Sequence, residues 1–505
     1  MKTNPYLLIL LLTVLMACRQ QTTRETQRLA FQPALFPDYT DITIPYNIAP
    51  LNFQLEDSIA TGFSVHIKGK GNHLFKTSTH TILFPIKEWN ALLEAEKGNT
   101  LHIEVTAHYN HKDAIYNEFT WEVSTDPIDR FLSYRLIEPA YEVWNKIQIR
   151  ERDLESFEER ILGDNNITEN VCMNCHIASG NNAQNTLMHI RGEKGGSIYT
   201  NEGKIRKIDT KTSETGTAVY GELSADGHYG IFTTAEIIPI LHSLHGKRLE
   251  VYDKGSDLVL IDFKQNSVSN HSAVSGKEYQ ETFPCFSADN RTVYFCRAPH
   301  LPQPDSTMHM HYDLYSIPFN QQTGTLGDST HLVFNAGQRG KSVSFPKCSP
   351  DGRFLLFCVS DYGTFPIWHP ETDLWLLDLK NGEVGTLPKA NGRYSDSYHS
   401  WNSNSRWFAF ASKRSDGIYG RVYFCHVDED GNATKAFVLP QKCPETYRTT
   451  LKSYNIPELY CQPEAYDAHI LRNVYLKKET EKFKYKSGYP VEYSEKHSIK
   501  TPNYQ

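Results

Sequence analysis

The residues with the clearest chemical meaning are Cys172-Met173-Asn174-Cys175-His176. Two thiols three positions apart, followed at once by an imidazole, match the attachment motif of c-type haem. In that chemistry each sulfur forms a thioether with a porphyrin vinyl group, and the adjacent histidine binds the iron from the proximal side. The pattern therefore predicts one covalent haem c on Cys172 and Cys175, with His176 as the proximal iron ligand.

Three other interpretations of the same residues stay open. A Cys-x-x-Cys pair can be a thioredoxin-like redox pair, although that motif belongs in a βαβ unit and the flanking residues here are polar. It can also form a plain disulfide. It can be half of a zinc site, but a second pair of ligands with suitable spacing is missing from the sequence. We favour haem.

The sixth iron ligand decides whether such a centre transfers electrons or binds small ligands. Met188 lies twelve residues beyond His176 and is the first candidate, with His189 as the alternative. Histidines of the later repeats are weaker candidates, and so is an alternating Met-His run that could suggest copper. These are His242, His245, His369, His399 and Met308-His309-Met310-His311.

The first 18 residues predict export and lipidation. Lys2 precedes an apolar run over residues 6–16, which suits the core of a signal peptide. The run ends in Leu15-Met16-Ala17-Cys18, which resembles a bacterial lipobox, so Cys18 would become the lipid-bearing first residue. We expect a lipid-anchored protein of the cell envelope, at the outer membrane and facing the periplasm.

Composition excludes some partners and favours β-structure. The chain has 505 residues, a net charge of −7 and 12% aromatic residues, without a basic block, so no nucleic-acid partner is expected. Cys18 and the haem pair leave seven further cysteines, an odd number, so at least one would be unpaired in an oxidising compartment, and we assign no disulfide pairing. These are Cys285, Cys296, Cys348, Cys358, Cys425, Cys443 and Cys461.

The chain divides into segments of different character. After the signal peptide (residues 1–18), residues 19–38 are a polar linker, and residues 39–125 show short strand-like runs that predict a β-sandwich-like domain. Residues 126–192 are expected to form a short helical haem-attachment segment. Within it, apolar residues at helical spacing predict a helix over residues 153–162.

A repeat decides the fold of the remainder. The stretches GELSADGHYGIF, FPCFSADNRTVYF, FPKCSPDGRFLLF and YHSWNSNSRWFAF carry Asp226, Asp289, Asp351 and Asn404 at steps of 63, 62 and 53 residues. Each stretch predicts two strands joined by a tight turn, and each is followed by a second hairpin-like stretch. Four strands per repeat make one propeller blade. We predict a mainly β protein whose residues 193–460 form a propeller of about six blades, with a charged tail over residues 461–505.

The repeat resembles the TolB-like, WD-repeat-like β-propellers of bacterial envelopes, and FPKCSPDGRFLLF is the stretch nearest to their blade motif. A lipobox, a sandwich-like region, one Cys-x-x-Cys-His and a TolB-like propeller together resemble envelope lipoproteins with a single c-type haem motif. The resemblance implies a haem-binding, cytochrome c-like protein. A propeller fold alone does not fix an activity.

The function expected from these observations is single-electron transfer, with the propeller as a docking platform for an unidentified redox or scaffold partner in the envelope. Two alternatives are a non-catalytic interaction or sensor propeller with a structural haem, and a peroxidase-like enzyme with an open distal site. No Gly-x-Ser-x-Gly elbow or phosphate-cradling glycine loop is present in the sequence.

Overall fold

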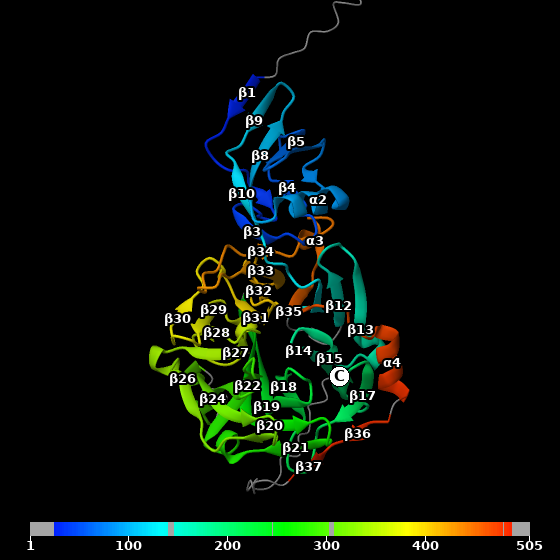
Figure 1. Cartoon of the computed structure of the whole chain (residues 1–505), viewed down its shortest axis with the longest axis vertical. Helices are drawn as coiled ribbons and strands as arrows, with labels where there is room; N and C mark the ends of the chain where they lie inside the picture. The colour runs from blue at the N-terminus through cyan, green and yellow to red at the C-terminus, as the bar shows by residue number, and fades with distance from the viewer. Residues whose placement is uncertain (1–24, 140–145, 245, 302–307, 478, 487–505) are drawn as a thin grey trace, which may run out of the picture.

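A computed structural model describes residues 25–139, 146–244, 246–301, 308–477 and 479–486. In this described part of the chain, six sheets of four or five strands surround a common axis (Figure 1). Their innermost strands neighbour one another in cyclic order, so the ring is closed. The predicted propeller of about six blades is confirmed.

The strands of each blade run from the axis outward. The inner strands of blades 1 to 6 are β14 (Met173–Ser179), β18 (Ala218–Leu223), β22 (Tyr279–Phe286), β27 (Ser342–Cys348), β31 (Asp396–Trp401) and β35 (Ser453–Tyr460). Blades 1 and 2 continue with β15 (Asn182–Ile190), β16 (Gly196–Asn201), β17 (Lys204–Asp209), β19 (Tyr229–Leu244), β20 (Lys247–Asp262) and β21 (Ser267–Asn270). Blades 3 to 5 continue with β23 (Thr292–Pro299), β24 (Asp313–Asn320), β25 (Thr325–Leu326), β26 (His331–Phe334), β28 (Phe354–Ser360), β29 (Asp373–Asp378), β30 (Val384–Thr386), β32 (Trp407–Ser412), β33 (Arg421–His426) and β34 (Phe437–Val438).

Blade 6 closes the ring with strands from distant parts of the sequence. Its outer three strands are β11 (Phe131–Ile137), β12 (Gln148–Asp153) and β13 (Glu159–Asp164), and its inner strand is the late β35, which pairs antiparallel with β11. The ring therefore cannot close until residues more than 300 positions apart have met.

The predicted turns recur with the same hydrogen bonds. In blades 2, 3 and 4 a serine hydroxyl donates to an aspartate two residues later, at 2.6 Å in each case. The pairs are Ser224 with Asp226, Ser287 with Asp289, and Ser349 with Asp351. The repeat seen in the sequence is therefore a repeat of local structure.

The predicted helix over residues 153–162 is wrong, because these residues belong to the β12–β13 hairpin. Charges face each other across this hairpin: Arg152 lies 2.9 Å from Glu159, and Arg160 lies 2.5 Å from Glu151. Such cross-strand pairs stabilise a hairpin, and pairing with β11 outweighed the helical spacing of the apolar residues. Residues 126–192 thus supply strands of blades 6 and 1 rather than a separate helical segment.

The segment after residue 460 is also more ordered than the predicted tail. It contains α4 (Ala468–Lys477), β36 (Glu481–Lys482) and β37 (Lys484–Tyr485). Strand β36 adds in parallel to β17 and β37 adds in parallel to β21, so the segment runs along the outside of blades 1 and 2. The short helices of the ring are η1 (Asn165–Thr168), η2 (Ser272–Val274), η4 (Gly337–Arg339), η5 (Pro366–Trp368) and α3 (Thr446–Thr449).

The N-terminal domain contains two sheets, as the sandwich-like prediction implied, and one helix that was not predicted. One sheet contains β1 (Glu25–Arg28), β3 (Ile42–Pro45), β5 (Gly62–Lys68), β6 (Asn72–Thr77), β8 (Thr100–His108), β9 (Lys112–Ile115) and β10 (Phe119–Ser124). The smaller sheet contains β2 (Leu35–Phe36), β4 (Phe53–Leu55) and β7 (Thr81–Ile82), and α2 spans Ile86–Glu96. The β1–β9 and β10–β3 pairs are parallel, so the domain is mixed rather than purely antiparallel.

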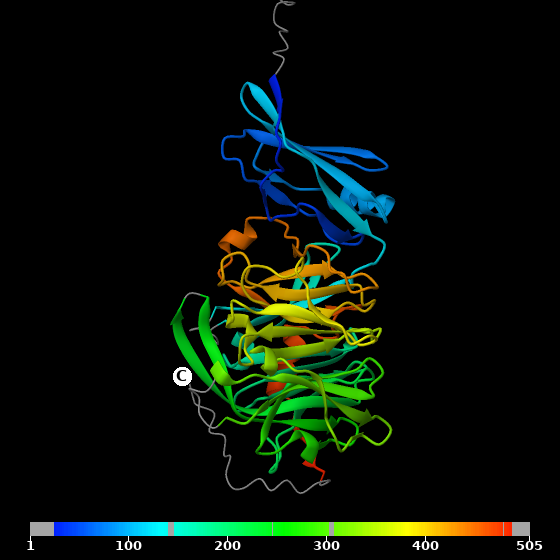
Figure 2. The ribbon, with the colours of Figure 1, turned by 90° about the vertical axis from the view of Figure 1, so that its left-hand side faces the viewer.

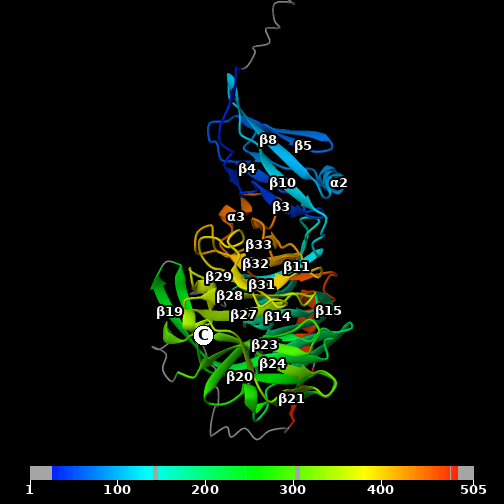
Figure 3. The ribbon, with the colours of Figure 1, turned by 60° about the vertical axis from the view of Figure 1, so that its left-hand side comes forward.

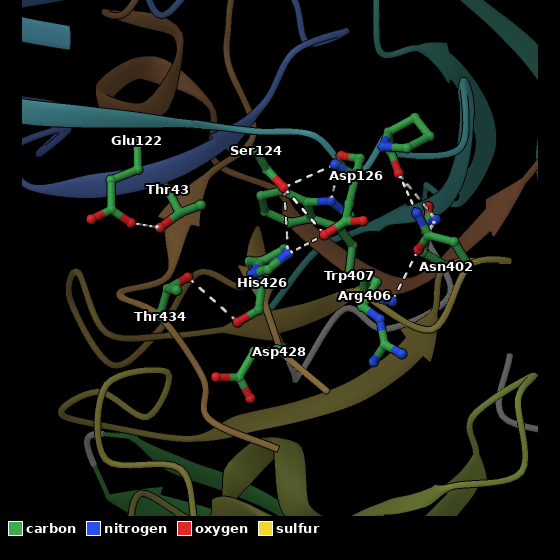
Figure 4. A network of polar contacts seen from close by, with 12 residues as sticks. Thr43, Glu122, Ser124, Asp126, Asn402, Arg406, Trp407, His426, Asp428 and Thr434 are labelled. Carbon is green, nitrogen blue, oxygen red and sulfur yellow. Dashed lines mark hydrogen bonds and ion pairs between the residues drawn. The ribbon is translucent and has the colours of Figure 1, made fainter. Parts of the chain in front are cut away.

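A polar network joins this domain to the rim of the ring (Figure 4). His426 Nε2 lies 2.8 Å from the Asp126 carboxylate, and the indole N–H of Trp407 donates to the Asp126 carbonyl at 3.0 Å. One apolar core continues from the domain into blade 5 through Trp407 and Phe424. The domain is therefore packed against the ring rather than loosely tethered to it.

One hairpin of blade 2 is much longer than the others. Strands β19 and β20 extend beyond the blade and leave one face of the ring, as Figures 2 and 3 show. The outer part of β20 packs on blade 4, where the Glu250 carboxylate lies 2.6 Å from His369 Nε2. No helix in the described part of the chain is long and apolar enough to cross a membrane.

Candidate functional site

The last four residues of the Cys-x-x-Cys-His motif lie on β14, the innermost strand of blade 1, and Cys172 directly precedes it. The pairing of β14 with β15 shifts between Asn174 and Ile177, so Cys175 and His176 form a β-bulge opposite the single residue Met188. A β-bulge inserts one residue into a strand and turns its side chains. The motif is therefore part of a strand, not of a helical turn.

The same bulge recurs in each inner strand of the described ring. The equivalents of Cys175 and His176 are Val219-Tyr220, Phe283-Pro284, Phe345-Pro346, Tyr398-His399 and Ile456-Pro457. Four of the first bulge residues have left-handed backbone, with φ between 47° and 51°. Blade 1 thus places a thiol and an imidazole where other blades mostly place an aromatic residue or proline.

His176 is buried and weakly partnered. It is 3% exposed, and neither ring nitrogen makes a hydrogen bond of normal geometry with a described residue, although the backbone of Ile456 interacts with the ring. Burial and the nearby charge of Arg135 lower the pKa of His176 to about 3, and the backbone of Ile456 offsets only part of this shift. At neutral pH the imidazole is therefore uncharged, and its nitrogens are available to a ligand.

His399 occupies the same bulge position in blade 5, and its ring nitrogens are satisfied. It is also 3% exposed, and burial lowers its pKa to about 3. One ring nitrogen lies 2.8 Å from the Leu356 carbonyl oxygen, and the other lies 3.8 Å from the Cys358 sulfur. By strand register, Arg135 occupies in blade 6 the position that Cys358 occupies in blade 4.

Cys172 lies just before β14, in an apolar core between blades 6 and 1 that we call the seam core. It is 5% exposed, and burial raises the pKa of its thiol although Arg191 and Arg135 oppose the shift. The seam core consists of Ile137, Ile147, Ile149, Leu162, Cys172, Met173, Met188, Ile190, Ile198, Tyr466, Leu471 and Tyr475. The side chain of Cys175 lies outside the described residues.

The two distal candidates are neighbours on β15, and both lie opposite the motif in strand register. Met188 is 1% exposed, faces the bulge across the β14–β15 pairing, and shares the seam core with Cys172. His189 follows it on the strand, where successive side chains point to opposite faces, and its Nδ1 lies 3.1 Å from the Ser197 hydroxyl. Burial lowers the pKa of His189 to about 4.

The other candidate histidines are not brought to the motif by a described contact. His369 lies between Glu250 and Glu371 at 2.6 and 2.9 Å; burial would lower its pKa, but these two carboxylates raise it to about 9. His242 is half-buried, and His245 lies outside the described residues, as do Cys18 and the rest of the predicted signal peptide.

In the Met-His run, Met308 is 65% exposed whereas Met310 is 2% exposed. Within the described ranges, no cluster of three or more His, Cys, Asp or Glu side chains could hold a metal ion.

Two residues, one next to the motif in space and one within it, were not singled out from the sequence. Arg135 is 7% exposed and acts electrostatically on both Cys172 and His176. Met173, inside the motif itself, is fully buried in the seam core and offers a second thioether there. The arginine gave no local signal, because it lies about 40 positions before the motif in the sequence.

No family model and no curated protein matches the chain. An oligogalacturonate lyase in complex with manganese aligns with 10% identity over 61% of this chain and 85% of its own, at a TM-score of 0.32. Two prolyl peptidases also align. One is a prolyl endopeptidase, and the other is prolyl oligopeptidase B from Galerina marginata.

The first of these peptidases shares 10% identity over 62% of this chain, at a TM-score of 0.32, and the second shares 8% over 78%, at 0.33. The aligned regions span about half of each peptidase, 49% and 50%. The blade count and ring closure described above come from this chain's own strand pairing. The chain is a six-bladed β-propeller protein with an N-terminal β-domain.

Proposed function

We propose that the chain carries one haem c on Cys172 and Cys175, with His176 as an iron ligand, and that it transfers single electrons. The observation that carries this proposal is the buried, uncharged imidazole of His176, whose nitrogens make no hydrogen bond of normal geometry in the described structure. A buried polar group without a partner is costly and calls for an explanation, such as a ligand. His399 makes the contrast clear, because the same position can satisfy an imidazole fully.

The residue types and their register support the proposal. Cys172 and His176 lie within the same five residues at the end of one buried strand, and Met188 lies opposite with a thioether. When bound, the haem would supply a one-electron couple at its iron. This chain's own residues would hold the iron ligand neutral, exclude water from the seam core and offer Met188 as a second ligand.

The remaining parts of the proposal concern location and partners. Lipidation at Cys18 would anchor the protein in the envelope, and the propeller would be the docking platform for a redox partner. The firm packing of the N-terminal domain on the ring supports a rigid platform, because one apolar core crosses the junction.

Intact-mass measurement of the full chain, made in a strain that matures c-type cytochromes, tests the proposal. We expect the mass of one haem on the wild-type chain, and loss of stable attachment in Cys172→Ser and Cys175→Ser. Cys443→Ser and Cys461→Ser are matched controls, because both thiols are exposed, and they should keep the haem. His176→Ala should change the absorption spectrum of whatever haem it retains. A wild-type chain with the bare protein mass would refute the proposal.

A further inference from the structure

The long hairpin of blade 2 covers one mouth of the ring. We call its outer part, residues 237–244 of β19 and 246–253 of β20, the arm, and Figures 2 and 3 show it on one face of the ring. Leu249 of the arm and Phe345 of blade 4 both pack against the apolar cluster that contains Tyr398 of blade 5. Phe345 and Tyr398 are bulge residues of innermost strands, so the arm reaches the axis of the ring.

An ion cluster fastens the arm to blade 4. Glu250 of the arm lies 2.6 Å from His369 Nε2, and Glu371 of blade 4 lies 2.9 Å from Nδ1 of the same ring. Burial would raise the pKa of Glu371, but His369 lowers it to about 2, and the two carboxylates hold His369 protonated at neutral pH. His369 and Glu371 therefore keep their charges through the mildly acid and neutral range.

Asp253 is a second contact of the arm, and it lies among neutral or acidic groups. It is 4% exposed, and its Oδ2 lies 3.5 Å from the Tyr312 hydroxyl of blade 3. Burial raises the pKa of Asp253 to about 7, Tyr312 opposes this shift, and Glu250 adds to it. A buried carboxylate is costly when no cation pairs with it, so the neutral acid is favoured at this position.

The hydrogen bonds around Tyr312 also favour a proton on Asp253. The Tyr312 hydroxyl donates its single proton to the Gln280 side-chain oxygen at 2.9 Å, and the Gln280 amide donates to His300 Nδ1 at 3.0 Å. A hydroxyl that has donated its proton can only accept from a second partner. The contact between Tyr312 and Asp253 is therefore a hydrogen bond when the carboxyl group of Asp253 carries a proton. Tyr312 and Gln280 are both 0% exposed.

From these contacts we infer that Asp253 is protonated while the arm is docked, and that the arm is released as the pH rises and this proton is lost. Docked and ionised, Asp253 would lie beside the acid Glu250 with no proton for Tyr312. In the released arm its charge would face water. The groups that face Asp253 are Tyr312 and Gln280 of blade 3, with His300 behind them, and Glu250 of the arm itself. The inference does not depend on the haem.

Proton linkage gives the expected size of the effect. Asp253 should have its ordinary pKa of 3.8 in the released arm, against about 7 in the docked arm. Between these values the docked arm binds one more proton, so docking should weaken about tenfold per pH unit and then level off above pH 7. Trp368 of blade 4 is 5% exposed in the cluster beneath the arm, and release would uncover it at the mouth of the ring.

Cleavage of the full chain by trypsin after Lys247 or Arg248, both on the arm, measures the released fraction. In the docked arm these side chains lie over rings of blade 4, at 4.2 Å from the centre of Tyr362 and 6.0 Å from that of Trp368. Each rate is divided by that of a peptide with the same residues, because trypsin itself responds to pH. From about pH 5.5 to 7 we expect this relative rate to rise roughly tenfold per pH unit, and then to stay constant.

Asp253→Asn is the decisive variant, because the amide keeps a donor for Tyr312 and stays uncharged. Its relative rate should not change with pH, and above pH 7 it should be at least about tenfold below that of wild type. Glu236→Gln is the matched control on the same hairpin. It removes an ion pair with Lys254 at the surface, and it should stay within about twofold of wild type. His300→Gln leaves Asp253 in place and should keep the pH dependence.

Cleavage at lysines and arginines outside the arm reports unfolding of the ring. If Asp253→Asn is cut there, Tyr312→Phe replaces it, because this variant removes the acceptor of the Asp253 proton and should speed cleavage of the arm several-fold at about pH 6. The inference is overturned if the relative rate of wild type does not rise between about pH 5.5 and 7, or rises equally in Asp253→Asn. Loss of the pH dependence in His300→Gln alone would overturn it as well, since His300 would then be the titrating group.

Discussion

His176 in blade 1 and His399 in blade 5 occupy the same bulge on the same kind of strand, with the same 3% exposure and the same lowered pKa of about 3. They differ in what the preceding blade offers them. Blade 4 presents a carbonyl and a thiol to His399, whereas blade 6 presents Arg135 and a weakly interacting backbone group of Ile456 to His176. A guanidinium has only donors, so it cannot accept a hydrogen bond from an imidazole N–H.

The comparison teaches that burial alone does not mark a functional histidine in this ring. His399 shows the structural solution, an imidazole that helps to join two blades. His176 departs from that solution at one position, where Arg135 replaces the thiol. A departure from a repeat that costs hydrogen bonds is expected at functional sites, and this supports a ligand at His176 rather than a purely structural role.

The largest expected effect is acid destabilisation of the haem-free chain, and it should be common to both histidines. Because each folded-state pKa, about 3, lies below the usual 6.5, the folded chain binds fewer protons than the unfolded chain between these values. The contribution of each histidine to the free energy of unfolding should have its full value above pH 6.5. It should fall by on the order of 1 kcal/mol per pH unit as the pH drops toward 3.

Urea unfolding of the haem-free chain at several pH values measures this slope. His176→Leu and His399→Leu should each reduce it by a similar amount, because each removes one buried group that must be protonated on unfolding. Equal slopes in wild type and both variants would mean that neither histidine is held neutral as described.

At neutral pH the two substitutions should instead separate. His399→Leu leaves the Leu356 carbonyl without its partner, which should cost about 1–3 kcal/mol. His176→Leu loses only the weak interaction with the Ile456 backbone and removes two polar atoms that make no hydrogen bond of normal geometry, so we expect no loss, or a gain of up to about 1 kcal/mol. Unfolding free energies at pH 7.5 provide the test. A loss in His176→Leu as large as that in His399→Leu would show that His176 has a structural partner.

The sequence predicted those parts of the fold that are encoded locally and repeated. The Ser-x-Asp turns and the strand pairs around them were recognisable because each blade encodes them within about 15 consecutive residues. Blade 6 was not recognisable in this way, because its strands lie more than 300 positions apart. The helical spacing in residues 153–162 misled the prediction, since pairing across the β12–β13 hairpin decides that segment.

The candidate site was predicted by residue type but not by environment. The spacing of Cys172, Cys175 and His176 suggested the chemistry, and Met188 was named from its distance along the chain. Ring closure brings the surrounding residues to these side chains: Arg135 comes from β11, Ile456 from β35 and Leu471 from α4. No local pattern encodes contacts between such distant residues, and the bulge that turns His176 between two blades is set by pairing register.

The smallest expected change in stability sharpens the comparison at the residue opposite each bulge, which is Met188 in blade 1 and Phe410 in blade 5. Met188→Leu conserves volume in the seam core, so it should cost less than about 1.5 kcal/mol. In the haem-loaded chain it should nevertheless convert a low-spin absorption spectrum to a high-spin one, because leucine has no sulfur to bind iron. Met173→Leu is the matched control, since Met173 is equally buried in the seam core. If Met188→Leu leaves the spectrum unchanged and His189→Leu alters it, the sixth ligand is His189. Blade 1 would then differ from blade 5 on both faces of its second strand.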